Sequence, residues 1–121
     1  MTTRTDPAWL LAGLGHFPGV VALRAGRLSF TTDEGVVLDA PLEKAAVTFP
    51  WYWFGGGFRV VAGGRRWKIS LTRPEGAPRP SVGLLEFSGL DGGLGSAAGS
   101  LRDVADGRRR GRAWRELLLG R

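Results

Sequence analysis

The sequence predicts a mainly β (α+β) protein, in which short antiparallel strands are followed by a C-terminal helix and preceded by a short N-terminal helix. Two pairs of strand-like runs are joined by tight turns, at Ala25-Gly26 and at Gly63-Gly64, which is a hairpin signature. After residue 94 the apolar residues recur at helical spacing instead. With 121 residues, the chain has the length of one domain, residues 1–121.

The N-terminal segment, residues 1–15, is predicted to be helical. Asp6 is a residue type that caps helices, and Pro7 suits the first helical position. The apolar residues that follow fit one or two turns of helix, and Gly13 and Gly15 then favour its end. This segment is therefore expected to lie outside the sheet.

Residues 18–87 are predicted to form the β core. Along the runs that flank each turn, side chains alternate between the two faces of a strand. In the second hairpin this alternation places Trp67 and Ile69 on an apolar face and Lys68 on a basic one. Glycine supplies the positive φ angles that two-residue hairpin turns need. The predicted strands are residues 19–24, 27–32, 36–39, 45–49, 58–62, 65–71 and 81–87.

The C-terminal segment, residues 94–119, is predicted to be a broken helix. Its apolar residues form two sets, one centred on Leu101 and one that includes Trp114. At about 100° per residue, these sets lie on nearly opposite sides of a straight helix. Each glycine in a helix costs about 1 kcal/mol relative to alanine. A break between Gly107 and Gly111 would let both sets be buried, so we expect a bend there.

Three segments resemble GRAM-like and bacterial pleckstrin-homology-like (PH-like) domains. Residues 18–30 are similar to the opening of those domains, with an apolar strand, a tight turn and a Leu-x-Phe strand. Residues 39–42 carry the Pro-Leu pair that leads into the next strand, and the hairpin of residues 58–71 fits the later strands. The resemblance covers residues 18–71, and the C-terminal helix matches by its order.

The resemblance implies a strongly bent antiparallel sheet of seven strands, or a partly open barrel, with one open end closed by the C-terminal helix. An unrelated small β-barrel with an appended helix is the alternative. PH-like domains mostly bind lipids, peptides or partner proteins and are rarely enzymes. Members that bind phosphoinositides often use a basic cluster at the first hairpin. Here that turn offers Arg24 and Arg27 alone, so headgroup binding at the turn is not expected.

Positive charge is concentrated near the C-terminus. The net charge is +6, and residues 101–121 hold seven arginines against three carboxylates. Basic segments attract nucleic acid, anionic membranes or acidic proteins. The basic residues that we single out are Arg59, Arg66 and Lys68 on one strand face with Arg65 at the turn, and Arg108, Arg109, Arg110 and Arg112 on the helix. Each group is either an ordinary solvated face or a surface for anions, including anionic lipid.

Four consecutive aromatic residues, Trp51, Tyr52, Trp53 and Phe54, form the most unusual segment of the chain. They cannot all face a core from one strand, because alternate side chains point to opposite faces. They are either covered internally, for example by Trp114, or they serve as the centre of a protein contact or as an anchor in a membrane interface. Self-association is one form of the protein contact.

No constellation for catalysis or metal binding is visible in the sequence. His16 is the single histidine, and the chain has no cysteine. Asp33, Glu34, Asp39 and Glu43 are explained by turns and solvated surface. Residues 93–98 match a G-x-G-x-x-A pattern, but the strand–helix–strand unit that gives this pattern meaning is missing. We therefore expect no catalytic residue, no metal ion and no cofactor.

The functional expectation is a non-enzymatic interaction module, which binds a protein partner or a second copy of itself through the aromatic segment. The alternatives are peripheral binding to an anionic membrane surface, and a β-barrel that binds a small ligand or catalyses a reaction. Nucleic acid is not expected as a partner. The chain has no apolar run near ~18 residues and no signal peptide pattern, which predicts a cytoplasmic location, with possible peripheral contact to the membrane.

Overall fold

A computed structural model describes residues 3–12, 15–50, 56–72, 80–81, 83–84 and 100–119, and within the helix it describes side chains from residue 107 onward. Its elements are β1 (Arg4–Ala12), β2 (Gly15–Arg24), β3 (Arg27–Thr32), β4 (Gly35–Pro41), the 3-10 helix η1 (Leu42–Lys44), β5 (Ala46–Thr48), β6 (Gly57–Ala62), β7 (Arg65–Ser70) and α2 (Ser100–Leu119). The prediction of a mainly β chain with a C-terminal helix is confirmed for these residues.

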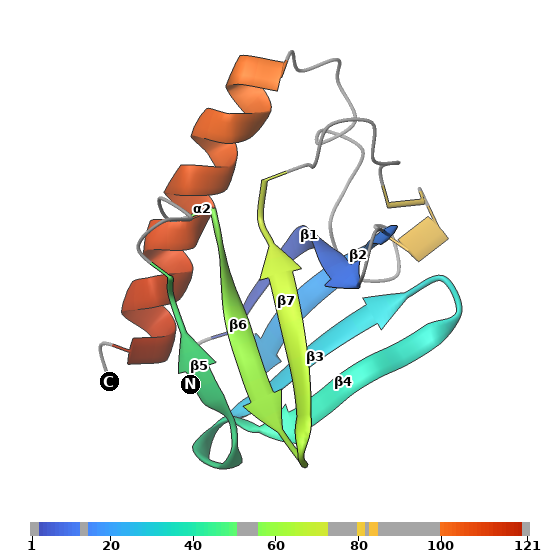
Figure 1. Cartoon of the computed structure of the whole chain (residues 1–121), viewed down its shortest axis with the longest axis vertical. Helices are drawn as coiled ribbons and strands as arrows, with labels where there is room; N and C mark the ends of the chain where they lie inside the picture. The colour runs from blue at the N-terminus through green and yellow to red at the C-terminus, as the bar shows by residue number, and fades with distance from the viewer. Residues whose placement is uncertain are drawn as a thin grey trace.

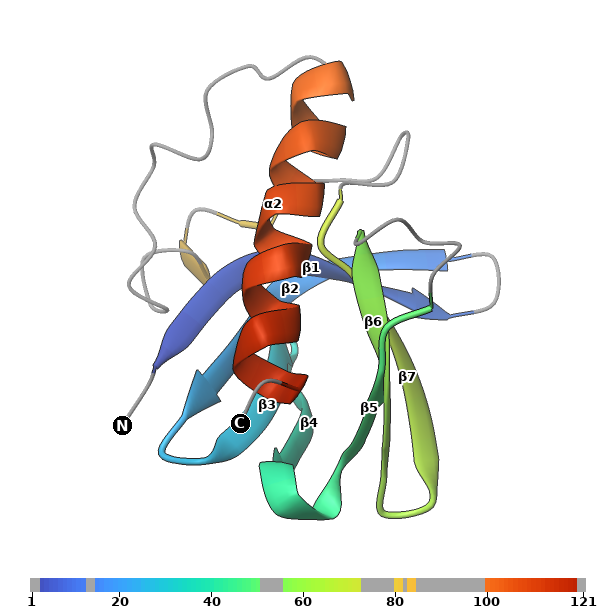
Figure 2. The ribbon, with the colours of Figure 1, turned by 90° about the vertical axis from the view of Figure 1, so that its left-hand side faces the viewer.

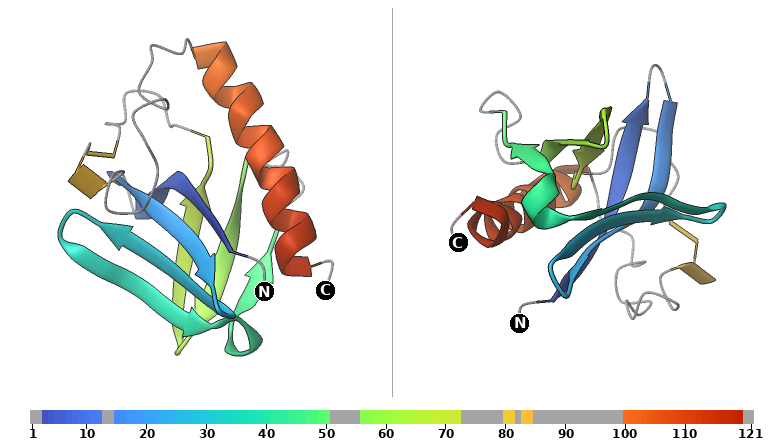
Figure 3. Two further views of the ribbon diagram at one scale, coloured as in Figure 1. Left: turned by 180° about the vertical axis from the view of Figure 1, so that it is seen from behind. Right: turned by 90° about the horizontal axis from the view of Figure 1, so that it is seen from below.

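The described strands form one open sheet of seven strands in the order β4-β3-β2-β1-β7-β6-β5. Every neighbouring pair is antiparallel. The sheet is bent, so that the half with β5, β6 and β7 lies across the half with β3 and β4 (Figure 1). The view from below in Figure 3 shows the two halves at a steep angle to each other. The inner surface of this bend forms the core.

Both predicted hairpins are confirmed. The β2–β3 turn has Ala25 at φ 51° and Gly26 at φ 75°, and the β6–β7 turn has Gly63 at φ 57° and Gly64 at φ 77°. Two successive positive φ angles match the right-handed twist of the flanking strands. The register that follows places Val21 opposite Phe30 and fixes which side chains of each strand face the core.

The predicted N-terminal helix is wrong, because residues 4–12 form β1 and not a helix. β1 is the central strand of the sheet, paired with β2 along its whole length and with β7 from Trp9 to Leu11. Ala8 is buried on one face and Trp9 on the other. A strand covered on both faces reads as a continuous apolar run, which resembles a short buried helix. At Pro7 only β2 is paired with β1, so the strand is locally an edge and tolerates proline.

The core lies between the bent sheet and α2, which crosses the open side next to β5 and β6 (Figures 1 and 2). Trp114 is fully buried, and its ring centre lies 5.9 Å from that of Phe58. Phe58 in turn lies 5.2 Å from Phe49. The indole Nε1 of Trp114 donates a 2.8 Å hydrogen bond to Asp6 Oδ2, so a polar contact also joins the helix to β1.

The predicted break in the C-terminal helix is wrong, because α2 continues without interruption from Ser100 to Leu119. Gly107, Gly111, Trp114 and Leu118 are all buried, and their spacing puts them on one stripe of the helix. A Cβ atom on Gly107 would lie 2.0 Å from Thr72 Oγ1. Gly107 therefore allows the helix to approach Thr72, just after β7, closely, and this contact offsets the low helix propensity of glycine.

Residues 80–81 and 83–84 lie beside the outer face of the sheet. Leu84 packs against Val20 of β2. Ser81 Oγ donates a 2.5 Å hydrogen bond to Asp33 Oδ1 and accepts one from the Leu84 backbone N–H. Gly83 and Leu84 are helical where a strand over residues 81–87 was expected, and residues 82 and 85–87 lie outside the described residues.

Candidate functional site

The predicted basic strand face is present on the outer surface of the β6–β7 hairpin. Arg59 lies directly opposite Lys68, and Val61 lies opposite Arg66. The neighbours of these residues along each strand, Val60 and Ile69, point into the core. The alternation of strand side chains therefore brings three cations and the exposed Val61 onto one surface.

The pairing of Arg59 with Lys68 is electrostatically unfavourable. Like charges directly opposite each other on neighbouring antiparallel strands destabilise the pair. Within the described ranges, no carboxylate lies at ion-pair distance from Arg59, Arg66 or Lys68. Among the described residues, the positive charge on the outer surface of this hairpin therefore has no neutralising carboxylate.

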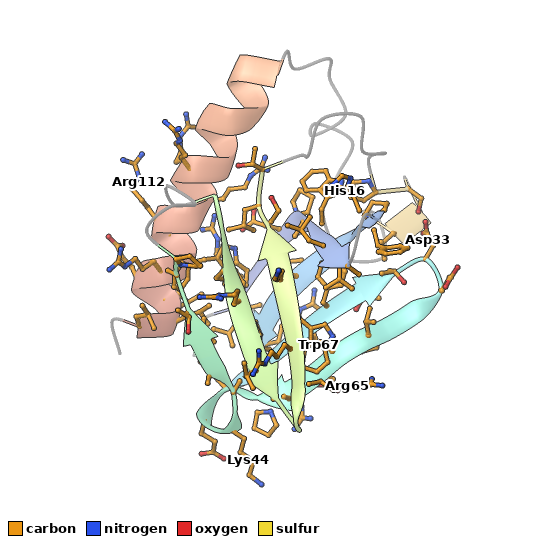
Figure 4. The ribbon with its side chains drawn as sticks, in the orientation of Figure 1. His16, Asp33, Lys44, Arg65, Trp67 and Arg112 are labelled. Atoms are coloured by element: carbon orange, nitrogen blue, oxygen red, sulfur yellow. The ribbon has the colours of Figure 1, made fainter. Side chains whose placement is uncertain are left out.

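Arg65 belongs to a different surface. It shares a face of β7 with Trp67, and both side chains lie on the same side of the strand in Figure 4. Together with Arg66 and residues 10–12 of β1, they line a hollow of about 300 Å³. Arg65 was predicted to lie at the turn, and the hollow beside it was not predicted from the sequence.

The predicted arginine cluster on the helix is divided by the structure. Arg108, Arg109 and Arg112 are exposed, whereas Arg110 is half-buried, with its Nε 3.9 Å from Asp6 Oδ1. Three consecutive residues on a helix point in three directions about 100° apart, which explains the separation. Arg110 therefore acts as a structural contact between α2 and β1.

Arg115 is an exposed residue of this surface that the prediction did not single out. At about 100° per residue, Arg108, Arg112 and Arg115 fall within an arc of about 60°, and Leu119 falls inside the same arc. Leu119 is 49% exposed. The spacing i, i+4, i+7 in the sequence was the signal that could have identified this arc.

The helix arginines and the strand cations both adjoin β5, which pairs with β6 through Ala46 opposite Val61 and Thr48 opposite Arg59. The Asp6 contact directs the Arg110 flank of α2 toward β1. Figure 2 shows α2 between the N-terminal part of β1 and β5, so the opposite flank of the helix is on the β5 side. We call this combined surface the basic side, and it consists of Arg59, Val61, Arg66, Lys68, Arg108, Arg112, Arg115 and Leu119.

A second surface lies around the β3–β4 turn, at the far side of the molecule from Arg112 (Figure 4). A hollow of about 320 Å³ is lined by Leu10, Phe17, Pro18, Thr32, Asp33, Glu34 and Val37. Phe17 is 49% exposed and the adjacent Val36 is 64% exposed. We call Phe17, Asp33, Glu34, Val36 and Val37 the acidic end.

The acidic end is held by local hydrogen bonds. The Glu34 backbone N–H donates to Thr32 Oγ1 at 3.2 Å, and Asp33 accepts from Ser81. In sequence, Asp33 and Glu34 were assigned to an ordinary turn. The two consecutive valines that follow the turn were the available signal, because an edge strand rarely exposes such residues without a partner.

The other candidate residues give no catalytic arrangement. His16 is exposed on β2, opposite Leu11. Asp39 accepts a 3.0 Å hydrogen bond from Arg27 Nε, and Glu43 is exposed in η1. Among the described residues there is no group of three or more potential metal ligands, and no helix is both long and apolar enough to cross a membrane. The aromatic residues Trp51, Tyr52, Trp53 and Phe54 lie outside the described residues.

Comparison of the sequence with models of protein families finds no match, and comparison with curated proteins finds none either. The two surfaces described above therefore provide the observations from which a function can be inferred.

Proposed function

We propose that this chain is a non-enzymatic interaction module of PH-like architecture, and that its acidic end binds a protein partner. The observation that carries this proposal is the hollow of about 320 Å³ whose rim combines exposed apolar side chains with two carboxylates. Clusters of exposed apolar residues on a soluble domain commonly mark sites of protein contact. The PH-like part is supported by the strand order and by the helix beside the open side of the sheet.

The rim of the hollow defines the partner chemistry. Phe17 and Val37 offer apolar surface, while Asp33 and Glu34 add negative charge beside it. A partner that fits therefore presents a large apolar side chain next to a lysine or arginine. The hollow of about 320 Å³ is at the lower end of the range for small-molecule sites, about 300 to 1,000 Å³, so it has room for one such side chain.

Peptide selection tests this proposal directly. The probe is a random peptide library displayed on phage and selected on the immobilised full chain. We expect enriched peptides that combine an aromatic or aliphatic residue with an adjacent lysine or arginine. The double substitution Phe17→Ser/Val37→Ser should abolish capture of the enriched peptides.

The matched control is Val61→Ser/Leu119→Ser, which removes two exposed apolar residues from the basic side and should leave peptide capture unchanged. Enrichment of acidic peptides, or equal loss of capture by both double variants, would contradict the assignment of the partner to the acidic end. Circular dichroism of each variant establishes that the fold is retained.

The aromatic segment supplies a second candidate contact, in which two copies of the chain associate. Tryptophan and tyrosine dominate the energetically important positions of protein interfaces, and Trp51, Tyr52, Trp53 and Phe54 are consecutive. Light scattering after size-exclusion chromatography tests this idea. We expect a dimer or larger species for the wild type and a monomer for Trp51→Ala/Trp53→Ala. A wild type that stays monomeric at high concentration would exclude self-association.

A further inference from the structure

We propose that the basic side is a docking surface for an anionic lipid bilayer. This proposal concerns a surface separate from the acidic end and does not depend on what binds there. The surface combines the strand and helix cations that adjoin β5 with two exposed aliphatic side chains.

The charge of the basic side is the first argument. Six cations contribute to it, namely Arg59, Arg66, Lys68, Arg108, Arg112 and Arg115. Arg59 and Lys68 face each other across two strands, an arrangement that costs stability in the free protein. Contact with a negatively charged surface removes this cost. Each lysine or arginine near an anionic leaflet strengthens binding roughly fivefold.

The apolar residues are the second argument. Val61 is 41% exposed and lies opposite Arg66, and Leu119 is 49% exposed within the arginine arc of α2. Surfaces that lie on membranes place apolar side chains among cations, because the apolar groups enter the boundary between headgroups and acyl chains. A nucleic-acid backbone offers these two side chains no comparable environment.

The shape of the basic side is the third argument. Of its six cations, only Arg66 borders either of the two hollows described above. The remaining residues extend over a hairpin surface and one flank of a helix. A broad face of this kind fits an extended anionic surface better than a small anion, which needs a concave site.

A second copy of the chain is the strongest competing occupant, because the acidic end carries charge of the opposite sign. However, the acidic end offers two carboxylates, and Asp33 already accepts a hydrogen bond from Ser81. Two carboxylates do not neutralise six cations. The excess of positive charge therefore favours a bilayer as the occupant.

Vesicle co-sedimentation tests the proposal with the full chain. The probes are vesicles of phosphatidylcholine alone and vesicles of phosphatidylcholine with phosphatidylserine. We expect binding to the anionic vesicles only, with a loss at high salt because exposed charges are screened. Arg59→Gln/Arg66→Gln/Lys68→Gln should weaken binding on the order of a hundredfold, and Arg112→Gln/Arg115→Gln roughly thirtyfold.

The matched control removes the same three charges elsewhere, as Arg24→Gln/Arg27→Gln/Lys44→Gln. Arg24 and Arg27 flank the β2–β3 turn, and Lys44 lies in η1, which a backbone hydrogen bond from Leu42 N–H to the Gly26 carbonyl joins to that turn. None of the three belongs to the basic side as defined above. The control should bind vesicles much more tightly than the strand variant does. If both triple variants lose binding equally, net charge explains the effect and the docking surface is wrong.

The exposed aliphatic residues separate a bilayer from other polyanions. Val61→Ser/Leu119→Ser should weaken vesicle binding several-fold, whereas Phe17→Ser/Val37→Ser should not change it. The proposal is overturned if a single-stranded oligonucleotide is bound and anionic vesicles are not. It is also overturned if light scattering shows that the strand variant dissociates an oligomer while vesicle binding stays at the wild-type level.

Discussion

The acidic end and the basic side both expose apolar residues beside charged side chains, but the charged side chains of the two surfaces differ in their neighbours. At the acidic end, Asp33 is hydrogen-bonded to Ser81 and the turn is closed through Thr32. On the basic side, Arg59 and Lys68 oppose each other with no described carboxylate nearby. A carboxylate that accepts a hydrogen bond within the chain is held in one position, whereas like charges that face each other across two strands favour the approach of an oppositely charged surface.

The largest expected effect comes from Trp114→Ala, because Trp114 packs α2 against the sheet. Its loss should separate the helix arginines from the strand cations of the basic side. Replacing a fully buried tryptophan by alanine leaves a cavity and typically costs about 3–5 kcal/mol. The Asp6 carboxylate also loses its indole donor. We expect the free energy of unfolding in urea to fall by about this amount, with loss of vesicle binding as α2 detaches.

Leu119→Ala is the control for this substitution, because Leu119 lies on the same helix and is exposed. Its effect on the free energy of unfolding should stay within about 0.5 kcal/mol. A similar loss of stability for both variants would mean that α2 does not pack through Trp114.

Gly107→Ala should also weaken the attachment of α2, by an amount that we expect to be about 1–3 kcal/mol. Helix propensity alone predicts the opposite sign, since alanine is favoured over glycine by about 1 kcal/mol. The close approach to Thr72 reverses that preference. Chemical denaturation measures the sign, and a more stable variant would contradict the tight contact between α2 and the end of β7.

Ser81→Ala tests the acidic end. It removes the donor to Asp33 Oδ1 and the acceptor of the Leu84 N–H. We expect a loss of about 1 kcal/mol and faster hydrogen exchange at the Leu84 amide, with unchanged exchange in the β6–β7 hairpin. Thr48→Ala, at an exposed position of β5, serves as the control and should leave both measurements unchanged.

Lys68→Glu should give the smallest change in stability. It should also change thermal stability and vesicle binding in opposite directions. The new carboxylate faces Arg59, so the like-charge pair becomes an opposite-charge pair worth about 0.2–1 kcal/mol. We expect a higher midpoint of thermal unfolding together with weaker binding to anionic vesicles. Lys44→Glu, outside the basic side, should change neither measurement appreciably. A fall in both stability and binding would indicate a damaged fold.

The parts of the fold that local rules determine were predictable from the sequence. Each hairpin follows from alternating side chains and a two-residue turn, and the shared face of Arg59, Arg66 and Lys68 follows from the same alternation. β1 was not predictable in this way, because its apolar run comes from burial on both faces, with Ala8 on one face and Trp9 on the other. The role of Gly107 in α2 likewise depends on a residue distant in sequence, Thr72, whose close approach makes Gly107 a packing residue.

The two candidate surfaces also differ in whether they depend on local geometry or on contacts between residues distant in sequence. The strand cations share a face through local geometry, whereas the acidic end requires Ser81 to meet Asp33 across 48 residues of sequence. Arg110 was grouped with its neighbours because they are consecutive. Only the position of Asp6 reveals that Arg110 is turned toward β1.

The central place of β1 affects how the chain reaches its native state. The meander of β2, β3 and β4 and the hairpin of β6 and β7 each form from neighbouring residues. β1 joins them, and its pairing of Trp9 with Ser70 closes a loop that spans half the chain. Closing so long a loop has an entropic cost before any contact compensates for it, so we expect the docking of β7 onto β1 to limit the rate of folding.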